Sequence, residues 1–321
     1  MYVATSGTLK RLLRSSHPHL ILTHSPCSHK NRSRLDAATY YRTLQPHPWF
    51  VVVPLDPSHD GKPVGCVVGY VHANGVGWIA LLLVKAAYRG RGMGGALGEV
   101  VQTYLRQRGV QRIGLDALEH MTEKYGRRGF VETNSVTYVV RQGVKDVPAV
   151  FAEEDQVAKG LSVVGLDEVP RERLVESDRE CSGLLRTTLW SPEGLFDRED
   201  VFGLALVGEQ GGVGESLRGW VVVRQCHDGY RIGPLYAESK VEASTLVKET
   251  LKAIDKKDRE GSVCAELFVG NRDALPVFEE LEFNAVANYR RMWKQGDEPE
   301  EQRAGGKGRR CMFAGFDAAH G

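Results

Sequence analysis

The sequence predicts an α+β (α/β) chain that uses one fold twice, each copy being a mixed, mainly antiparallel twisted sheet flanked by helices. Short apolar runs bounded by turn residues alternate with stretches whose apolar residues repeat at helical spacing. A shift of 153 residues superposes the two halves, laying Tyr125 on Phe278 and Phe130 on Phe283. The length of 321 residues, with 42% hydrophobic and 26% charged residues, suits two ordinary globular domains.

The elements of the first unit follow from apolar spacing and turn residues. In chain order they are a short helix (36–44), three strands of an antiparallel meander (49–53, 64–71 and 78–84), an amphipathic helix, a strand (110–117), a shorter helix (122–128) and a strand (136–141). Pro46 ends the first helix, because proline disfavours helical geometry in the residue before it. Apolar residues repeat at helical spacing from Leu97, and Gly109 supplies a left-handed residue where that helix ends.

The second unit repeats this order of strands and helices. Its expected elements are a strand (161–166), a helical region (171–189), two hairpin strands (201–207 and 217–224), a strand (230–236), a helix with one buried face, a strand (263–269), a helix (273–281), a strand that closes the sheet (288–293) and, after a polar loop (296–310), a last strand (311–316). The helix with one buried face is expected to bury Ala243, Leu246, Val247, Thr250, Leu251 and Ile254.

The chain is therefore expected to consist of four segments. They are a basic N-terminal segment (1–35), a first domain (36–145), a charged linker (146–160) and a second domain (161–321). Residues 1–35 hold six Lys or Arg residues and no acidic residue. This bias is typical of organellar transit peptides, but basic extensions are common, so a cytoplasmic protein is the favoured interpretation and an organellar one the alternative.

Composition and charge exclude several classes of partner. The 42 Lys and Arg residues nearly balance the 41 Asp and Glu residues, so we expect no nucleic-acid partner. The longest apolar run, 76–84, is nine residues long, too short to span a bilayer, so we expect no membrane partner. The six cysteines form no C-x-x-C pair, which argues against a metal site or a disulfide framework and favours a reducing compartment. A monomer or a homodimer is expected.

A glycine-rich turn stands between the third strand and the amphipathic helix. It reads Arg89-Gly90-Arg91-Gly92-Met93-Gly94 and fits the pattern R-x-x-G-x-G. Glycines let the backbone wrap closely around a ligand, and the first-turn N–H groups of a helix attract anions. With two arginines nearby, the turn predicts a diphosphate site. It lacks the Gly-Lys-Ser/Thr of a Walker sequence and the parallel context of a dinucleotide fold.

These motifs together resemble the GNAT superfamily of acetyl-CoA-dependent N-acetyltransferases. In the first half they are 81–84 followed by the glycine-rich turn, then Leu115-Asp116-Ala117 and the run 125–130 (YGRRGF). In the second half, 229–235, 271–274 and 290–293 resemble the C-terminal half of tandem-GNAT proteins. The resemblance covers about residues 36–321.

The resemblance implies acetyl-CoA as a co-substrate, with no metal. Backbone amides of 91–96 would hold the CoA pyrophosphate, and the strand edge at 82–84 would pair with the pantetheine arm. The cofactor-binding residues implied in this way are Leu82, Leu83, Val84, Arg89, Arg91, Gly92, Met93, Gly94, Gly95 and Ala96.

The family often uses a tyrosine to protonate the departing CoA thiolate, and Tyr125 occupies that position. A phenol is protonated at neutral pH, so it can donate a proton to the leaving sulfur. The alternative is that Tyr125 only packs against the sheet.

The general base is less clearly marked. Many relatives place a glutamate on the fourth strand, but 78–84 contains no carboxylate. Asp116 is the first candidate, followed by Glu119 and His120. A water chain could also remove the proton, and an amine that binds in its neutral form would need no dedicated base.

The second unit departs from the catalytic pattern. It lacks R-x-x-G-x-G, Phe278 replaces the tyrosine, and Glu282 replaces Gly129. We therefore expect a degenerate second domain. Its Arg231, Tyr236 and Asn271 are candidates for a cleft facing the first unit, although capping of the next helix is the favoured role of Asn271.

The function predicted on this basis is an acetyl-CoA-dependent N-acetyltransferase. Its acceptor would be a small-molecule or peptide primary amine, which attacks the thioester directly in a ternary complex. The alternative is a non-catalytic CoA-binding or scaffold protein. Two observations motivate this alternative: the fourth strand has no carboxylate, and residues 1–35 lack the usual strand and helices that wall the acceptor site.

Overall fold

The computed structural model describes residues 2–4, 49–53, 63–144, 160–208, 217–257 and 261–321. The helix expected at 36–44 lies outside the described residues. So do the basic segment apart from 2–4 and the linker apart from residue 160. Within the described part, no helix is both long and apolar enough to cross a membrane.

The described strands form a single mixed sheet of 13 strands. In chain order they are β1 (Tyr2–Ala4), β2 (Trp49–Val53), β3 (Gly65–Val71), β4 (Val76–Val84), β5 (Arg112–Leu118), β6 (Phe130–Arg141), β7 (Leu161–Gly165), β8 (Val201–Gly208), β9 (Leu217–Cys226), β10 (Gly229–Ala237), β11 (Ser262–Phe268), β12 (Asn284–Lys294) and β13 (Met312–Ala314). The strands β2, β3 and β4 pair antiparallel, which confirms the meander, and β8 and β9 form the expected hairpin.

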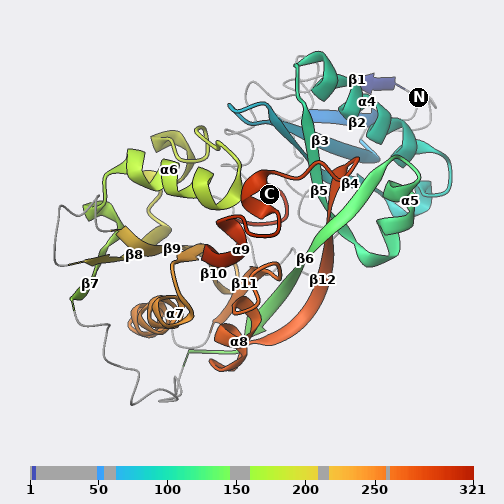
Figure 1. Cartoon of the computed structure of the whole chain (residues 1–321). Helices are drawn as coiled ribbons and strands as arrows, with labels where there is room; N and C mark the ends of the chain where they lie inside the picture. Colours follow the sequence, from blue (N-terminus) through green and yellow to red (C-terminus); the bar gives the residue numbers. More distant parts are fainter. Residues whose placement is uncertain (1, 5–48, 54–62, 145–159, 209–216, 258–260) are drawn as a thin grey trace.

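Helices flank this sheet on both units (Figure 1). They are α4 (Met93–Gln107), α5 (Thr122–Gly126), α6 (Arg171–Ser182), α7 (Lys240–Asp255), α8 (Ala274–Glu279) and α9 (Gly308–Cys311). Shorter turns are η1 (Ala86–Tyr88), η2 (Glu119–Met121), η3 (Leu166–Glu168), the π-helical η4 (Pro192–Phe196) and η5 (Glu300–Gln302). The helical region expected at 171–189 ends earlier, because Gly183 adopts a left-handed conformation with φ 73°.

The two amphipathic helices bury the faces that their sequences predict. On α4, Leu97, Val101 and Leu105 are fully buried against the first half of the sheet. On α7, the six predicted positions are all buried. Gly109 has φ 73°, which confirms it as the left-handed residue after α4.

The two units exchange strands at the centre of the sheet. The order there is β5-β12-β6-β11, so β12 of the second unit lies between two strands of the first, and β6 pairs with β11 (Figure 1). The expectation that 288–293 closes the sheet was wrong, because this strand is central. Its apolar pattern predicts a strand, whereas its neighbours in the sheet are fixed by pairing across more than 140 residues of sequence.

The polar loop expected at 296–310 contains η5 and α9, and β13 is shorter than the strand expected at 311–316. After β13 the chain returns to the first unit. Trp78 donates its indole N–H to the carbonyl of Ala318 at 3.1 Å, and Arg186 donates to the carbonyl of Gly321 at 2.7 Å. These contacts hold the segment 315–321 against β4 of the first unit and against Arg186 of the second.

His320 lies buried in that segment between both units. Its Nδ1 lies 3.1 Å from Asp317 Oδ1, and its Nε2 lies 3.2 Å from the hydroxyl of Tyr70. Burial lowers the pKa of His320, with Arg224 and Arg186 acting in the same direction and Asp317 opposing them. The neutral imidazole is therefore the form that the folded protein holds.

This lowered pKa predicts that stability falls on acidification. Because the pKa of His320 in the folded protein lies below the unfolded value near 6.5, protonation favours the unfolded state. The contribution of neutral His320 to stability is therefore fully present above pH 6.5 and is lost as the pH falls through the folded pKa. Denaturant unfolding at pH 7.5 and 5.5 should show this loss, up to about 1.4 kcal/mol per pH unit. A His320→Gln variant should show a smaller slope between the two pH values, and an unchanged slope would dismiss the role of His320.

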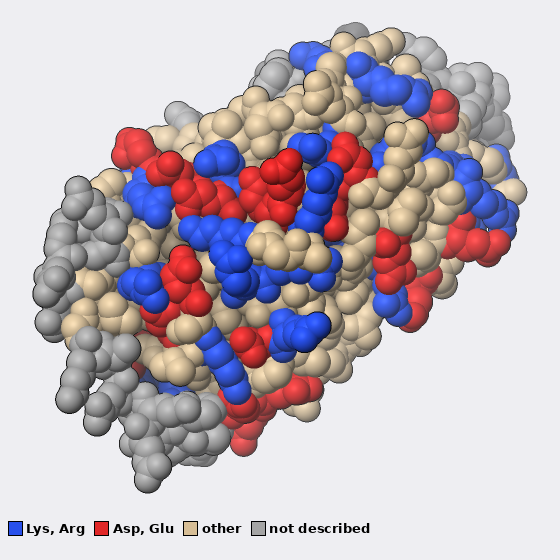
Figure 2. All heavy atoms as spheres, viewed as in Figure 1, with Lys and Arg blue, Asp and Glu red and all other residues tan. Residues whose placement is uncertain are grey.

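Acidic and basic side chains are interleaved on the face shown in Figure 2, with no broad area of one sign. Exposed ion pairs of the described residues include Arg127–Glu123 and Lys252–Glu249. Each such pair is worth little to stability, since both partners are solvated.

Candidate active site

The parallel strands β4 and β5 separate halfway along their length. They pair at three positions, ending with Trp78 opposite Gly114, and no pair joins them in the described structure beyond that point. The edge of β4 from Ile79 to Val84 therefore faces an opening instead of a neighbouring strand on that side. The backbone groups of such an edge can pair with an extended ligand.

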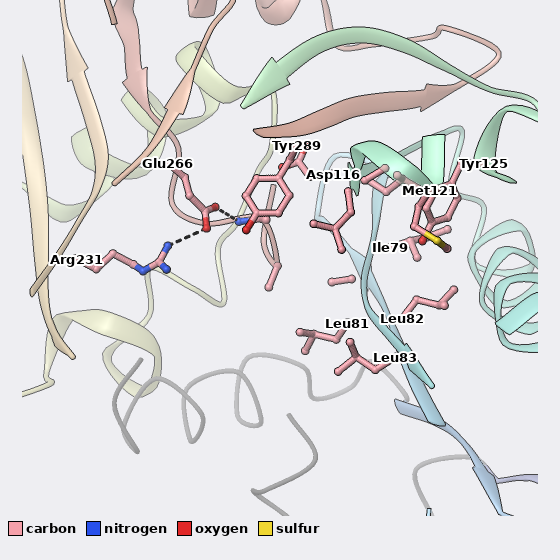
Figure 3. Close-up of a pocket in the computed structure, with 16 residues that line it drawn as sticks. Ile79, Leu81, Leu82, Leu83, Asp116, Met121, Tyr125, Arg231, Glu266 and Tyr289 are labelled. Carbon is pink, nitrogen blue, oxygen red and sulfur yellow. Dashed lines mark hydrogen bonds and ion pairs between the residues drawn. The ribbon is translucent and has the colours of Figure 1, made fainter. Parts of the chain in front are cut away.

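This opening contains a cavity of about 180 Å³, here called the splay cavity. It is lined by both units: Ile79, Ala80, Leu81, Leu82, Leu83, Leu115, Asp116, Ala117, Leu118, Met121 and Tyr125 of the first and Arg231, Glu266, Tyr289, Ala318 and Ala319 of the second. Tyr125 and Met121 lie at one end, and Arg231 and Glu266 lie at the other (Figure 3). Apolar side chains make up most of the wall between these ends.

The strand β4 carries a bulge at the cavity. Cys66 pairs with Leu83 and Val68 pairs with Ala80, so Leu81 and Leu82 both stand opposite the single residue Val67. Leu81 has φ 51°, a left-handed conformation that costs a non-glycine residue on the order of 1–3 kcal/mol. Such strain at a cavity wall indicates a functional constraint on the backbone of β4.

The glycine-rich turn leads from the end of β4 into α4. Gly92 is the residue before α4 and has φ 77°, and no side chain caps the helix. A Cβ atom added at Gly90 or Gly92 would meet nothing within 4 Å, so the space beside these two residues is open. The first-turn amides of α4 have no acceptor within the helix and point towards this space.

Three arginines surround this helix end. Arg89 and Arg91 are exposed, with Arg89 Nε donating to the carbonyl of Val84 at 3.0 Å and Arg91 stacked over Tyr88. The third is Arg128, whose Nη2 lies 3.0 Å from where a side chain of Gly95 would begin. The guanidinium of Arg128 therefore lies close to the backbone of the first turn of α4. The resulting arrangement suits a diphosphate.

Tyr125 lies on α5 with its ring packed edge-on against Phe130. It lines the splay cavity. Burial raises the pKa of Tyr125 above its usual value, and Arg128 opposes this shift. The hydroxyl therefore stays protonated at neutral pH and above, as a proton donor must.

Asp116 also lines the splay cavity, and both of its carboxylate oxygens accept from one arginine. Arg291 of β12 donates to both oxygens, at 2.9 and 2.8 Å, and both side chains are almost completely buried. The guanidinium stacks near the rings of Trp78 and Phe268 and reaches Gln302 at 3.4 Å. This bidentate pair joins the two units at the exchanged strand.

A second buried carboxylate reaches the cavity from the other unit. Glu266 of β11 accepts a hydrogen bond from Arg231 at 3.0 Å and another from the backbone N–H of Ala318 (Figure 3). It is 4% exposed. The splay cavity is therefore bordered by two carboxylates, and each has an arginine partner.

The corresponding place in the second unit is closed to phosphate. Ser239 precedes α7, and its hydroxyl accepts a hydrogen bond from the backbone N–H of Glu242 at 3.3 Å. The carboxylate of Glu242 lies in the same first turn and pairs with Arg218. A carboxylate at the start of a helix repels an anion. Phe278, which corresponds to Tyr125, is fully buried in the core. The second domain is degenerate at the positions that the first uses.

The three residues proposed for a cleft facing the first unit have different environments. Arg231 lines the splay cavity, as expected. Tyr236 is buried elsewhere and donates its hydroxyl to Asp178 at 2.7 Å. Asn271 accepts from the N–H of Asp273 at 3.0 Å and donates to the carbonyl of Arg310 at 2.9 Å, but no side chain caps α8, so the expected capping role was wrong. No group of His, Cys, Asp or Glu side chains that could hold a metal occurs among the described residues.

Several residues of the site were not among those predicted from the sequence. Leu81 lies within a run of leucines, and nothing in that run marks the left-handed residue. Arg128 was visible in the YGRRGF run, where a basic residue next to the predicted acid was a usable signal. Glu266, Tyr289 and Arg291 lie on second-unit strands, and only the exchange of strands places them beside the first unit.

Family models match both halves of the chain. The model of the Acetyltransferase (GNAT) family matches residues 14–130, and the model of the Acetyltransferase (GNAT) domain matches residues 175–305. Together these matches span more than half of the chain. The chain belongs to the GNAT superfamily, as a tandem protein with a degenerate C-terminal GNAT-like domain.

Individual relatives agree with this family. A holothin acyltransferase from Pseudoalteromonas sp. (strain SANK 73390) is 26% identical over 248 residues, covering 76% of each chain. A putative acetyltransferase from Pyrococcus horikoshii has a TM-score of 0.64 at 22% identity, covering 89% of this chain and 85% of its own. A tandem GNAT protein from the clavulanic acid biosynthesis pathway has a TM-score of 0.60 at 14% identity, covering 91% and 98%. The solved structures confirm the fold, two GNAT-like units with mixed sheets flanked by helices.

Proposed function

We propose that this protein is an N-acetyltransferase that transfers the acetyl group of acetyl-CoA to a primary amine by direct attack within a ternary complex. One observation carries the proposal: the open helix end of α4, the unpaired edge of β4 and the splay cavity are continuous along the chain from Ile79 to Ala96. A diphosphate, an extended arm and a reactive thioester would find their sites in that order.

The residues along this path fit acetyl-CoA. The amides of Gly92–Ala96 would hold the diphosphate, together with Arg89, Arg91 and Arg128. The backbone at Leu82, Leu83 and Val84 would pair with the pantetheine arm, and Met93, Gly94 and Gly95 would form the wall beside it. When bound, acetyl-CoA supplies a thioester carbonyl that an amine can attack.

The side chains of this protein then have distinct tasks. A backbone N–H at the β4 bulge would stabilise the negative charge that develops on the carbonyl oxygen. Tyr125 would donate its proton to the departing sulfur. Asp116 was predicted as the base, but because both of its oxygens accept from Arg291, we propose that it positions β5 against β12.

The comparisons support an acyltransferase. The curated relative is named as an acyltransferase of holothin, and by that likeness we propose a small-molecule amine in preference to a peptide. Isothermal titration of acetyl-CoA into the full chain tests the cofactor, and release of CoA with a panel of amines tests transfer. Absence of binding would overturn the proposal, whereas binding without transfer to any amine would favour the scaffold alternative.

The Tyr125→Phe variant tests the proton donor. Its turnover should fall by about 10²-fold or more, because the thiolate loses its acid, while the Kd for acetyl-CoA stays the same. Tyr104→Phe is a matched control, since Tyr104 lies on α4, packs against Phe50 and does not line the splay cavity. Equal turnover in the two variants would dismiss Tyr125 as the acid.

A further inference from the structure

The ionisable side chains that line the splay cavity balance one another. They are Asp116, Tyr125, Arg231, Glu266 and Tyr289, with Arg291 directly behind Asp116. Asp116 pairs with Arg291, and Glu266 pairs with Arg231. The pKa of Tyr125 is raised, so it stays neutral. Among the described residues, the cavity therefore presents no carboxylate without a cationic partner.

This balance decides which form of an amine can bind. Moving an alkylammonium ion from water into the cavity costs a large desolvation free energy unless a negative group pairs with it. Both carboxylates of the cavity already form an ion pair with an arginine. Proton removal from that ion would also need a base, and breaking either buried pair to supply one leaves an arginine uncompensated. A neutral amine has neither cost, and its lone pair is free for attack.

The remaining walls suit an aromatic ring. Ile79, Leu115, Leu118 and Met121 present apolar surface, and Tyr289, the strand partner of Leu118 on β12, adds an aromatic ring to the lining. Glu266 accepts two hydrogen bonds from the protein, and a carboxylate has about four acceptor sites. It can therefore also accept an N–H of a neutral amine without neutralising a cation.

We propose, on the basis of the proposed N-acetyltransferase function, that the acceptor is a weakly basic aromatic amine that binds in its neutral form. The amine nitrogen forms the C–N bond as the C–S bond breaks, and Tyr125 gives its proton to sulfur. The surplus proton on nitrogen passes to water, and water returns a proton to Tyr125. The products are the N-aryl amide and the free thiol of CoA, so atoms and charges balance.

Matched amine pairs test the acceptor class. Aniline and 3-aminophenol are neutral at pH 6.5, whereas benzylamine and 3-hydroxybenzylamine, of similar size, are protonated. We expect kcat/KM at pH 6.5 to be at least tenfold higher for the aromatic amines. For these it should be flat up to pH 8.5, whereas for the alkylamines it should rise about tenfold per pH unit as the free base forms. Titration calorimetry in the presence of CoA should show the same preference in amine binding.

Leu118 allows a gain-of-function test. It lies at the end of β5, lines the splay cavity and is 39% exposed, so a polar residue is tolerated there. Leu118→Asp adds a carboxylate without an arginine partner, and Leu118→Asn is its neutral control. The ratio of benzylamine to aniline binding should rise about fivefold in Leu118→Asp relative to Leu118→Asn, as for a partly exposed ion pair.

The possible results distinguish a failure of the neutral-amine inference from a failure of the proposed acetyltransferase function. Equal or better use of benzylamine at pH 6.5 overturns the neutral-amine inference and leaves the acetyltransferase intact. Binding of acetyl-CoA with transfer to neither class of amine also overturns the inference. Failure to bind acetyl-CoA at all overturns the proposed function itself.

Discussion

Replacing Gly92 with glutamate is expected to weaken acetyl-CoA binding at least 100-fold, as measured by isothermal titration. Gly92 precedes α4 in a left-handed conformation, with open space where a side chain would project. A glutamate there places a carboxylate in front of the first-turn amides, at the proposed position of the diphosphate. This carboxylate competes for the same N–H donors and repels the phosphates. The loss of acetyl-CoA affinity therefore has two causes, a blocked site and like-charge repulsion.

Gly75→Glu is the matched control for this variant. Gly75 lies in the turn between β3 and β4, has φ 75° and likewise has nothing within 4 Å of a new side chain. Both variants thus carry the same added charge and a similar backbone strain of about 1–2 kcal/mol. Gly75→Glu should keep the Kd of the wild type within about twofold. If both variants lose binding equally, the loss reports on strain, and the diphosphate assignment to α4 is wrong.

The glycine-rich turn could be predicted because the residues that determine its conformation are close together in the sequence. Arg89, Gly92 and the apolar stripe that begins at Leu97 lie within ten positions of one another. Helix-end geometry depends on nearby residues only, so spacing alone indicates an anion site. The left-handed Leu81 is different, because its conformation is imposed by the pairing of β4 with β3 on either side of it.

The acceptor end of the site could not be predicted in this way. The sequence placed Asp116 on a strand near the chemistry, and the structure does put it in the cavity wall. Its partner Arg291 is 175 residues away and reaches it only because β12 enters the sheet of the first unit. Glu266 is likewise brought in by the pairing of β6 with β11. Strand partners depend on the whole fold, which hydrophobic periodicity does not encode.

Breaking the buried pair between Asp116 and Arg291 is expected to destabilise the protein by about 3–5 kcal/mol. Asp116→Asn leaves the guanidinium of Arg291, which is 3% exposed, without its anion and against the rings of Trp78 and Phe268. Because this pair joins β5 to β12, its loss also loosens the contact between the two units. Denaturant unfolding measures the free energy. The matched control is Glu123→Gln, which removes an exposed partner of Arg127 and should leave the stability close to that of the wild type.

A double variant then separates the structural role of Asp116 from a chemical one. Asp116→Leu with Arg291→Met removes both charges and keeps similar volume, and such replacements of buried pairs are often neutral or stabilising. We expect the double variant to recover most of the stability lost by Asp116→Asn, together with turnover of an aromatic amine. Recovered stability with turnover still reduced by 10²-fold or more would mean that Asp116 acts on the substrate. The carboxylate would then have to leave Arg291 in each catalytic cycle, and the neutral-amine inference would fail with it.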